Sequence, residues 1–384
     1  MHAVHFAITP LAGAPLRIVQ AINAHTPHTA RLVDLCRYGT EDFGQDVVFS
    51  EQPELACALA ENADIIHFHN YLDLDSRHFA PIDFRRLQRK GTLVIRHFHS
   101  HPGLVASRMG ITAHRLLEQP IPSLVVAQFQ ERYYPRSRVV PNFVPEADPL
   151  YSPLPDPVPA YRHDVFFSPT NFRSAWEDRW NTKSAPQAHA AIIAACKQAK
   201  ASWVLVHKTP LREALALKQM SRIVVDDLTT GSYHLTGLEA LSQGKPVLCY
   251  LDGRTQRVFS YFAGTAGTGT PAQTPFVHTP LEELPRRLGQ LLAAPEDAAA
   301  IGRAGRTFML AHWPSARMAE HLSEAYDLLA RDPALVTRQP ELALTSPVAV
   351  FFARTLPDIQ HRVRQMRAGG TIGSLFRRSV QRPA

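Results

Sequence analysis

Residues 223–250 constrain the fold of this chain more than any other stretch. The apolar segment Ile223–Val225 predicts a buried β-strand, and a polar loop that contains Gly231 follows it. Residues Thr236–Gln243 then predict a short helix with a single acid, Glu239, before a Gly-Lys-Pro turn and a second apolar strand. This order is typical of open α/β sheets, in which ligands bind beyond the carboxyl ends of parallel strands. The loop and the helix N-terminus suit a diphosphate, and a buried glutamate suits a pair of ribose hydroxyls.

Two such α/β patterns are separated by a proline-rich stretch. A chain of 384 residues exceeds what one core usually organises, so two domains are expected. Apolar strands without clean alternation, joined by helices, predict parallel sheets covered on both faces. We therefore expect an α/β fold with two Rossmann-like, doubly wound domains that face each other across a cleft. The expected parts are a domain at 1–150, a stiff linker at 151–162, a domain at 163–340 and a basic helical tail at 341–384.

The individual elements follow from apolar periodicity and from proline and glycine positions. Expected strands are Ala3–Ile8, Arg31–Leu35, Asp64–Phe68, Thr92–Ile95, Ser123–Ala127, Arg138–Val140, Asp164–Ser168, Trp203–His207, Ile223–Val225 and Pro246–Leu251. Expected helices are Pro15–Ala24, Ala185–Ala199, Leu211–Met220, Thr236–Gln243, Leu281–Ala293, Glu296–Ala311 and Ser315–Ala330.

Composition excludes several classes of protein. Hydrophobic residues make up 45% and charged residues 20% of the chain, which is an ordinary globular balance. No run approaches the ~18 apolar residues of a membrane span, and the N-terminus predicts a first strand rather than a signal peptide. The four cysteines have no paired spacing, which predicts reduced thiols in a cytoplasmic protein. The net charge of +7 is moderate, and the basic residues form no patch interleaved with aromatic residues, so no nucleic-acid partner is expected.

Histidines follow two predicted strands directly, at His67-Phe68-His69-Asn70 and at His97-Phe98-His99-Ser100-His101. Parallel strands joined by a crossover helix end at the same edge of a sheet, so these side chains are expected to gather beside the cleft. A metal site is one interpretation, since imidazole is a common metal ligand. No acid stands at a matching position and alternating residues face opposite sides of a strand, so we predict no metal site. Hydrogen-bonded structural histidines are the second interpretation. The third is a catalytic or substrate-orienting residue, for which we choose His99, with His69 and Asn70 as neighbouring candidates for contact with a second substrate.

Two loops are further candidates. The first strand leads into Thr9–Pro15, a loop of small residues with Gly13 that lacks the three-glycine dinucleotide fingerprint, so neither NAD nor FAD is expected. It either lets a ligand approach a helix N-terminus or is simply a tight turn. In the second domain, Arg173 and Lys183 flank the start of a helix and could clamp a pyrophosphate, with Arg179 as a rival. A solvated charged loop explains these basic residues equally well.

The segment around Glu239 resembles one family of enzymes. The matching residues are Glu239-Ala240-Leu241 and Gly244-Lys245-Pro246-Val247, and the whole pattern covers roughly residues 1–330. They resemble the GT-B nucleotide-sugar glycosyltransferases, specifically the retaining family four, whose motif is acid-x7-acid. The resemblance implies that Glu239 binds the donor ribose. The family's first acid falls on Gly231, and the sequence Gly231–His234 is similar to a subgroup that lacks this acid.

The resemblance also implies roles for other residues. Backbone amides at Tyr233 and His234 would bind the donor phosphates, His99 would lie near the sugar, and Arg173 with Lys183 would form the basic phosphate pair. The implied activity is that of a hexosyltransferase (EC 2.4), which moves a sugar from a nucleotide-diphosphate donor with retention. No Asp-x-Asp motif is present, so no metal and no cofactor are expected. The implied acceptor is a glycan, a lipid-linked glycan or a protein, in the synthesis of cell-envelope or surface polysaccharide.

The basic tail leaves two interpretations open. Its arginines could lie on an anionic membrane surface, which would place a cytoplasmic protein at the inner face of the membrane. Alternatively, the tail crosses back to the first domain as a structural helix. The missing acid at Gly231 also favours an alternative function, a catalytically degenerate GT-B-like protein that binds a sugar nucleotide or a glycan. A further alternative function is that of a GT-B enzyme that is not a transferase, such as a sugar-nucleotide epimerase.

Overall fold

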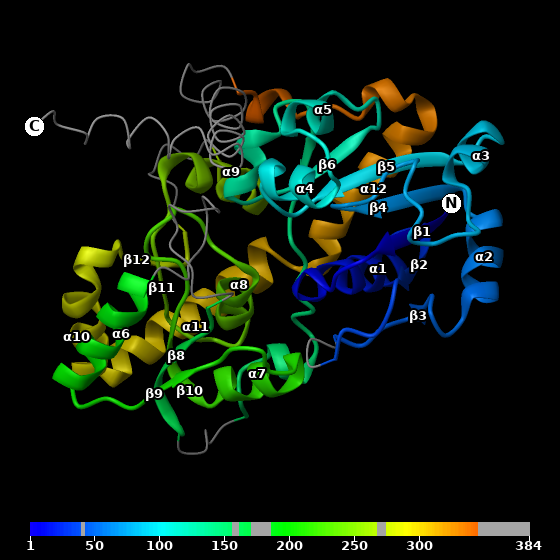
Figure 1. Cartoon of the computed structure of the whole chain (residues 1–384). Coiled ribbons are helices and arrows are strands. Elements are labelled where there is room, and N and C mark those ends of the chain that lie inside the picture. Colours follow the sequence, from blue (N-terminus) through cyan, green and yellow to red (C-terminus); the bar gives the residue numbers. More distant parts are fainter. Residues whose placement is uncertain (40–42, 156–160, 170–185, 267–273, 345–384) are drawn as a thin grey trace, which may run out of the picture.

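The computed structural model describes residues 1–39, 43–155, 161–169, 186–266 and 274–344. It contains one parallel sheet of seven strands and one of five, each packed between helices (Figure 1). The α/β fold with two Rossmann-like units is thereby confirmed. Each strand and helix range predicted between residues 3 and 330 overlaps an observed one, with shifts of a few residues at the ends.

The N-terminal sheet has the strand order β3-β2-β1-β4-β5-β6-β7. Its strands are β1 (His2–Ala7), β2 (Thr29–Asp34), β3 (Val47–Val48), β4 (Ile65–His69), β5 (Leu93–Phe98), β6 (Ser123–Val126) and β7 (Arg138–Val140). The helices between them are α1 (Ala14–His25), α2 (Pro53–Glu61), α3 (Phe84–Arg89), α4 (Pro102–Arg108) and α5 (Ala113–Glu118). The order of strands reverses between β1 and β4, which makes this point the expected ligand crevice of the sheet.

Side-chain alternation divides the core of this domain into two faces. Val4 and Phe6 of β1 pack with α2 and α3 on one face. The neighbouring Ala3 and Ala7 face the other side, in the same core as residues of α1 and α4. Both faces are therefore covered, as expected for apolar parallel strands.

The second sheet has the order β12-β11-β10-β8-β9 and reverses between β8 and β10. Its strands are β8 (His163–Phe167), β9 (Trp203–Leu205), β10 (Ser221–Val225), β11 (Val247–Cys249) and β12 (Val277–His278). The helices of this half are α6 (Pro186–Gln198), α7 (Leu211–Gln219), α8 (Leu235–Ser242), α9 (Gly253–Ala263), α10 (Leu284–Ala293), α11 (Pro295–His312) and α12 (Ser315–Arg331). Helix α9 had no predicted range, although an N-capping Asp252 and a C-capping Gly264 are visible in the sequence.

The last helix returns to the first domain. Helix α12 packs against α1, and in Figure 1 it lies beside β4 and β5. Beyond it, Gln339 hydrogen-bonds both the amide and the carbonyl of Val139, on edge strand β7. Residues 315–339, within the range predicted for the C-terminal domain, thus lie against the N-terminal one. The predicted tail lies outside the described residues from 345 onward, and no helix within the described ranges is long and apolar enough to cross a membrane.

Candidate functional site

A cavity of about 750 Å³ lies where the carboxyl ends of the two sheets meet. Leu11 and Ala12, from the loop after β1, line it on the N-terminal side. Ser168, which follows β8, and Thr236 of α8 line it on the other side. The cavity thus joins both points at which strand order reverses, and its volume is typical of small-molecule sites.

Glu239 is buried at the wall of this cavity between two cations. Arg17 Nη2 of α1 donates to Glu239 Oε1 at 2.6 Å, and Lys218 Nζ of α7 donates to Oε2. Burial by itself raises the pKa of the Glu239 carboxyl, but Lys218 and Arg17 outweigh it and hold that pKa below 4.5. The carboxylate is therefore ionised, and the group of three carries a net positive charge. Because Arg17 belongs to the first domain, this ion pair also ties the two domains together at the cavity.

Lys218 and Arg17 were not predicted as site residues. Both lie on amphipathic helices, where a basic residue normally indicates a solvated face. Lys218 instead lines the cavity and is 2% exposed, and Arg17 is 4% exposed. Their spacing from Glu239 in sequence offers no signal that the three meet.

A carboxylate–imidazole contact is a second feature that sequence reasoning missed. Asp226 directly follows β10 and is fully buried, with Oδ1 3.3 Å from Nδ1 of His234. His234 lines the cavity, so the acid orients an imidazole toward the ligand space. The signal was available, since an Asp directly after a buried strand lies at the edge where ligands bind.

The predicted donor loop has a different arrangement from the one expected. The amide of His234 donates to Asp226 Oδ2 at 2.7 Å and is therefore already engaged. Tyr233 is fully buried, its hydroxyl donates to the Ala127 carbonyl, and its ring packs edge-on against Phe259. Tyr233 thus serves the core between the domains. Of this loop, the His234 side chain reaches the cavity.

Gly231 has a structural reason to be glycine. Its φ is +81°, in the left-handed region, and an added Cβ would lie 2.9 Å from Cβ of Asp252. Asp252 caps α9 and pairs with Arg132 at 2.8 Å, so it is not free to move away. An acidic side chain at 231 would meet the same two obstacles.

Gly231→Ala is therefore expected to lower the free energy of unfolding by about 1–3 kcal/mol, through backbone strain and contact with Asp252. Gly253→Ala is the matched control, because it lies at the first turn of α9 with nothing within 4 Å of the added Cβ. Urea unfolding of both variants measures the difference. Equal stability of the two would show that the loop accepts a side chain at 231.

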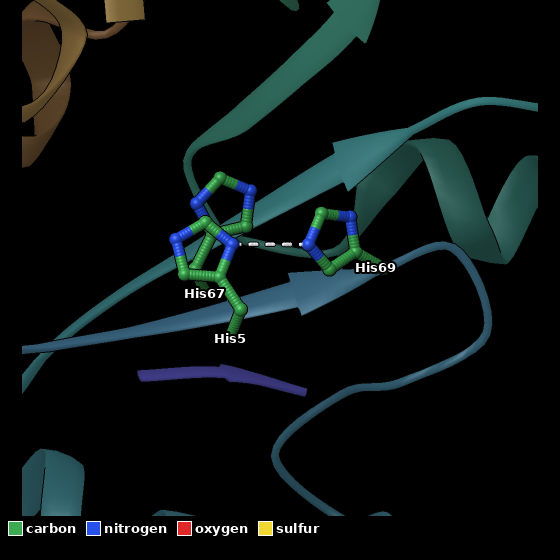
Figure 2. Close-up of side chains that lie close together, drawn as sticks. All are labelled: His5, His67 and His69. Carbon is green, nitrogen blue, oxygen red and sulfur yellow. Dashed lines mark hydrogen bonds between the residues drawn. The ribbon is translucent and has the colours of Figure 1, made fainter. Parts of the chain in front are cut away.

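The histidines gather as expected, but with a different geometry. His67 and His69 are two residues apart on β4 and face the same side. His97 of β5 and His99, the first residue after that strand, stack on each other, and His5 of β1 joins the group. The five rings form one group of stacked and tilted neighbours. Figure 2 shows three of them, with His5 Nδ1 3.1 Å from His69 Nε2. The expectation that they would face opposite sides was wrong, because residues i and i+2 share a face of a strand.

These imidazoles are neutral at neutral pH. Burial lowers the pKa of His99 to about 3, and burial together with neighbouring His99 does the same for His5. Among these histidines, His99 lines the cavity. His69 is buried and does not line it, and its Nδ1 lies 3.0 Å from His99 Nε2. Asn70 positions His99, since its Oδ1 accepts from the His99 amide at 2.7 Å.

Strained backbone surrounds the cavity. Leu11, Ala12 and Lys208 line it, and Asn70 lies behind His99; all four have φ between 47° and 54°. Non-glycine residues in this region carry strain that is common at ligand sites. Gly13 ends the same loop with a φ of +76° and directs α1 from behind the cavity wall, packed on Phe43. Arg173, Lys183 and Arg179 lie outside the described residues.

Comparison with known proteins identifies this architecture. No family model and no curated protein matches the chain in sequence. Among solved structures, a glycosyltransferase from Rickettsia africae ESF-5 matches 86% of this chain and 99% of its own, at 12% identity and a TM-score of 0.50. Anabaena HepE in complex with UDP and glucose matches 85% and 99%, at 11% identity and 0.50. An α-glucosyltransferase in complex with UDP and a 13-mer DNA matches 86% and 99%, at 11% identity and 0.51.

The chain therefore has the GT-B fold, with two Rossmann-like domains and the cavity between them.

Proposed function

We propose that this protein is a glycosyltransferase that holds a nucleotide-diphosphate sugar in the interdomain cavity. The observation that carries the proposal is the Arg17–Glu239–Lys218 group, a net positive cluster at a cavity that joins the two switch points. Two of the similar structures hold UDP, which is a ligand of the proposed class.

The leaving group is a nucleoside diphosphate, so its growing negative charge needs fixed positive partners. Lys218 lines the cavity, and so do Leu235 and Thr236 at the N-terminus of α8, whose backbone dipole favours anions. Arg173 and Lys183 would add to these partners in the same proposal. A carboxylate has about four lone-pair positions, so Glu239 can still accept from ribose hydroxyls while it pairs with both cations.

The finer parts of the proposal follow from the family resemblance. His99 would orient the sugar, transfer would proceed with retention, and the step would need no divalent ion because protein cations face the diphosphate. We further propose a glycan or lipid-linked acceptor in cell-envelope polysaccharide synthesis, in the cytoplasm or at the inner membrane face through the basic tail. Liposome flotation with and without residues 354–384 tests that last point.

The donor site is tested by Lys218→Met. Loss of one charge-assisted hydrogen bond, worth about 1.5–3 kcal/mol, should weaken nucleoside diphosphate binding by about 10- to 150-fold in calorimetry. A thermal-shift panel of UDP, GDP and dTDP on the unchanged protein selects the ligand.

Lys245→Met is the matched control, because Lys245 is a buried lysine that donates to the Gln219 carbonyl and does not line the cavity. Its nucleotide affinity should equal that of the unchanged protein. Equal affinities in Lys218→Met and Lys245→Met, or no binding of any nucleoside diphosphate, would contradict the donor site.

A binding protein without turnover is the second candidate, and the backbone at Gly231 favours it because that position cannot accept the family's first acid. Release of nucleoside diphosphate from a sugar nucleotide in the presence of cell-envelope extract distinguishes the two. A transferase gives release coupled to a glycan product, whereas a binding protein gives neither.

A further inference from the structure

The histidine group beside the cavity contains ring nitrogens without a hydrogen-bond partner among the described residues. His97 is 1% exposed, and neither Nδ1 nor Nε2 forms a hydrogen bond with any described residue. Nε2 of His67 is likewise buried and forms no hydrogen bond with any described residue. Leaving a buried polar group unpaired costs about 1–3 kcal/mol, so a ligand for His97 is the simplest physical reason to retain it.

Three of the histidines form a compact set of ligand atoms. One ring nitrogen from each of His69, His97 and His99 lies within 4.8 Å of the others. His69 Nδ1 and His99 Nε2 face each other at 3.0 Å. Tetrahedral zinc with Zn–N bonds of about 2.0–2.1 Å places its nitrogen ligands roughly 3.3 Å apart, so this pair needs only a small adjustment.

The hydrogen bonds behind this set are compatible with tautomers that leave His69 Nδ1 able to coordinate. His69 Nε2 can donate to His5 Nδ1 at 3.1 Å (Figure 2). His5 Nε2 can in turn donate to the Tyr326 hydroxyl at 2.9 Å. That hydroxyl can then donate to His67 Nδ1 at 2.8 Å. With the protons placed in this way, His69 Nδ1 carries a lone pair that points toward His99. Metal-bound histidines usually donate their second N–H in this manner.

We propose that His69, His97 and His99 bind one divalent transition-metal ion, with zinc as the representative ion. Imidazole nitrogen suits zinc, copper, iron and nickel. His99 lines the cavity, so the fourth position opens toward it and takes a water or an oxygen of a bound molecule. Three histidines with one open position form a common type of zinc site. The proposal departs from the sequence-based expectation of no metal, which assumed that these histidines face opposite sides of their strands. It also goes beyond glycosyl transfer, and its test needs no nucleotide.

The test measures metal binding to the full chain after removal of bound metal. Equilibrium dialysis against ZnCl₂ with elemental analysis should give one equivalent per chain. Cobalt(II) should give the intense visible absorption of a tetrahedral ion. His97→Gln and His69→Gln should each weaken zinc binding at least tenfold and remove the cobalt band.

His25→Gln and His78→Gln are the controls, because both side chains are exposed and away from the cluster. They should retain one equivalent and the full band. Far-ultraviolet circular dichroism checks that each variant is folded. If a buried substitution prevents folding, the half-buried His99→Gln takes its place. Less than 0.1 equivalent in the unchanged protein, or unchanged affinity in the folded cluster variants, would overturn the metal site.

Discussion

Glu239→Ala is expected to lower the free energy of unfolding by about 3–5 kcal/mol and to abolish tight nucleoside diphosphate binding. The substitution leaves Arg17 and Lys218 buried without a counter-charge, and an uncompensated buried charge is costly. It also removes the acceptor proposed for the ribose hydroxyls. Urea unfolding and calorimetry with the nucleotide chosen by thermal shift measure the two losses separately.

The control for this variant is Glu282→Ala, whose side chain is exposed and which should change neither quantity. Retention of full stability by Glu239→Ala would mean that the two cations reach water or another anion. Lowering the pH should also remove the contribution that ionised Glu239 makes to the free energy of unfolding. The pKa of Glu239 is depressed in the folded state, so its contribution is present above pH 4.5 and is lost as the pH falls through the folded pKa.

Glu131→Ala is expected to cause the second large loss, about 3 kcal/mol of unfolding free energy, while nucleotide affinity stays within a few-fold. Glu131 is 1% exposed and accepts from Arg254 at 2.7 Å and from Arg338 at 2.5 Å. Arg254 begins α9 in the second domain, so this buried group joins the domains away from the cavity.

Comparison of the two glutamates separates stability from binding. Both are buried between two cations, and Glu239 alone of the pair lines the cavity. Loss of nucleotide affinity to the same extent in both variants would show that the domain arrangement, rather than contact with Glu239, controls binding. In that case the direct role proposed for Glu239 would be withdrawn.

Much of the fold was predictable because its signals are local. The segment Ile223–Val225 is apolar and followed by a polar loop, and its neighbours in sequence suffice to place it as the carboxyl-terminal part of β10. The gathering of His69 and His99 at one edge followed from chain topology alone. The helix α12 was also predicted, but its packing against α1 was not, because an amphipathic helix does not specify which surface it covers.

The sequence by itself determined where strands end, that His99 directly follows one of them, and that Glu239 lies on the short helix after the loop that follows β10. Tertiary structure alone decided that Arg17 and Lys218 meet Glu239, that Gly231 lies against Asp252, and that the histidine rings share one face with Tyr326. The physical reason is that periodicity reflects neighbours a few residues away. Desolvation and ion pairing depend on segments that are distant in sequence. The strand–loop–helix segment at residues 223–250 therefore predicted one wall of the cavity. The cations that neighbour Glu239 there, Arg17 and Lys218, are brought to it by the tertiary fold.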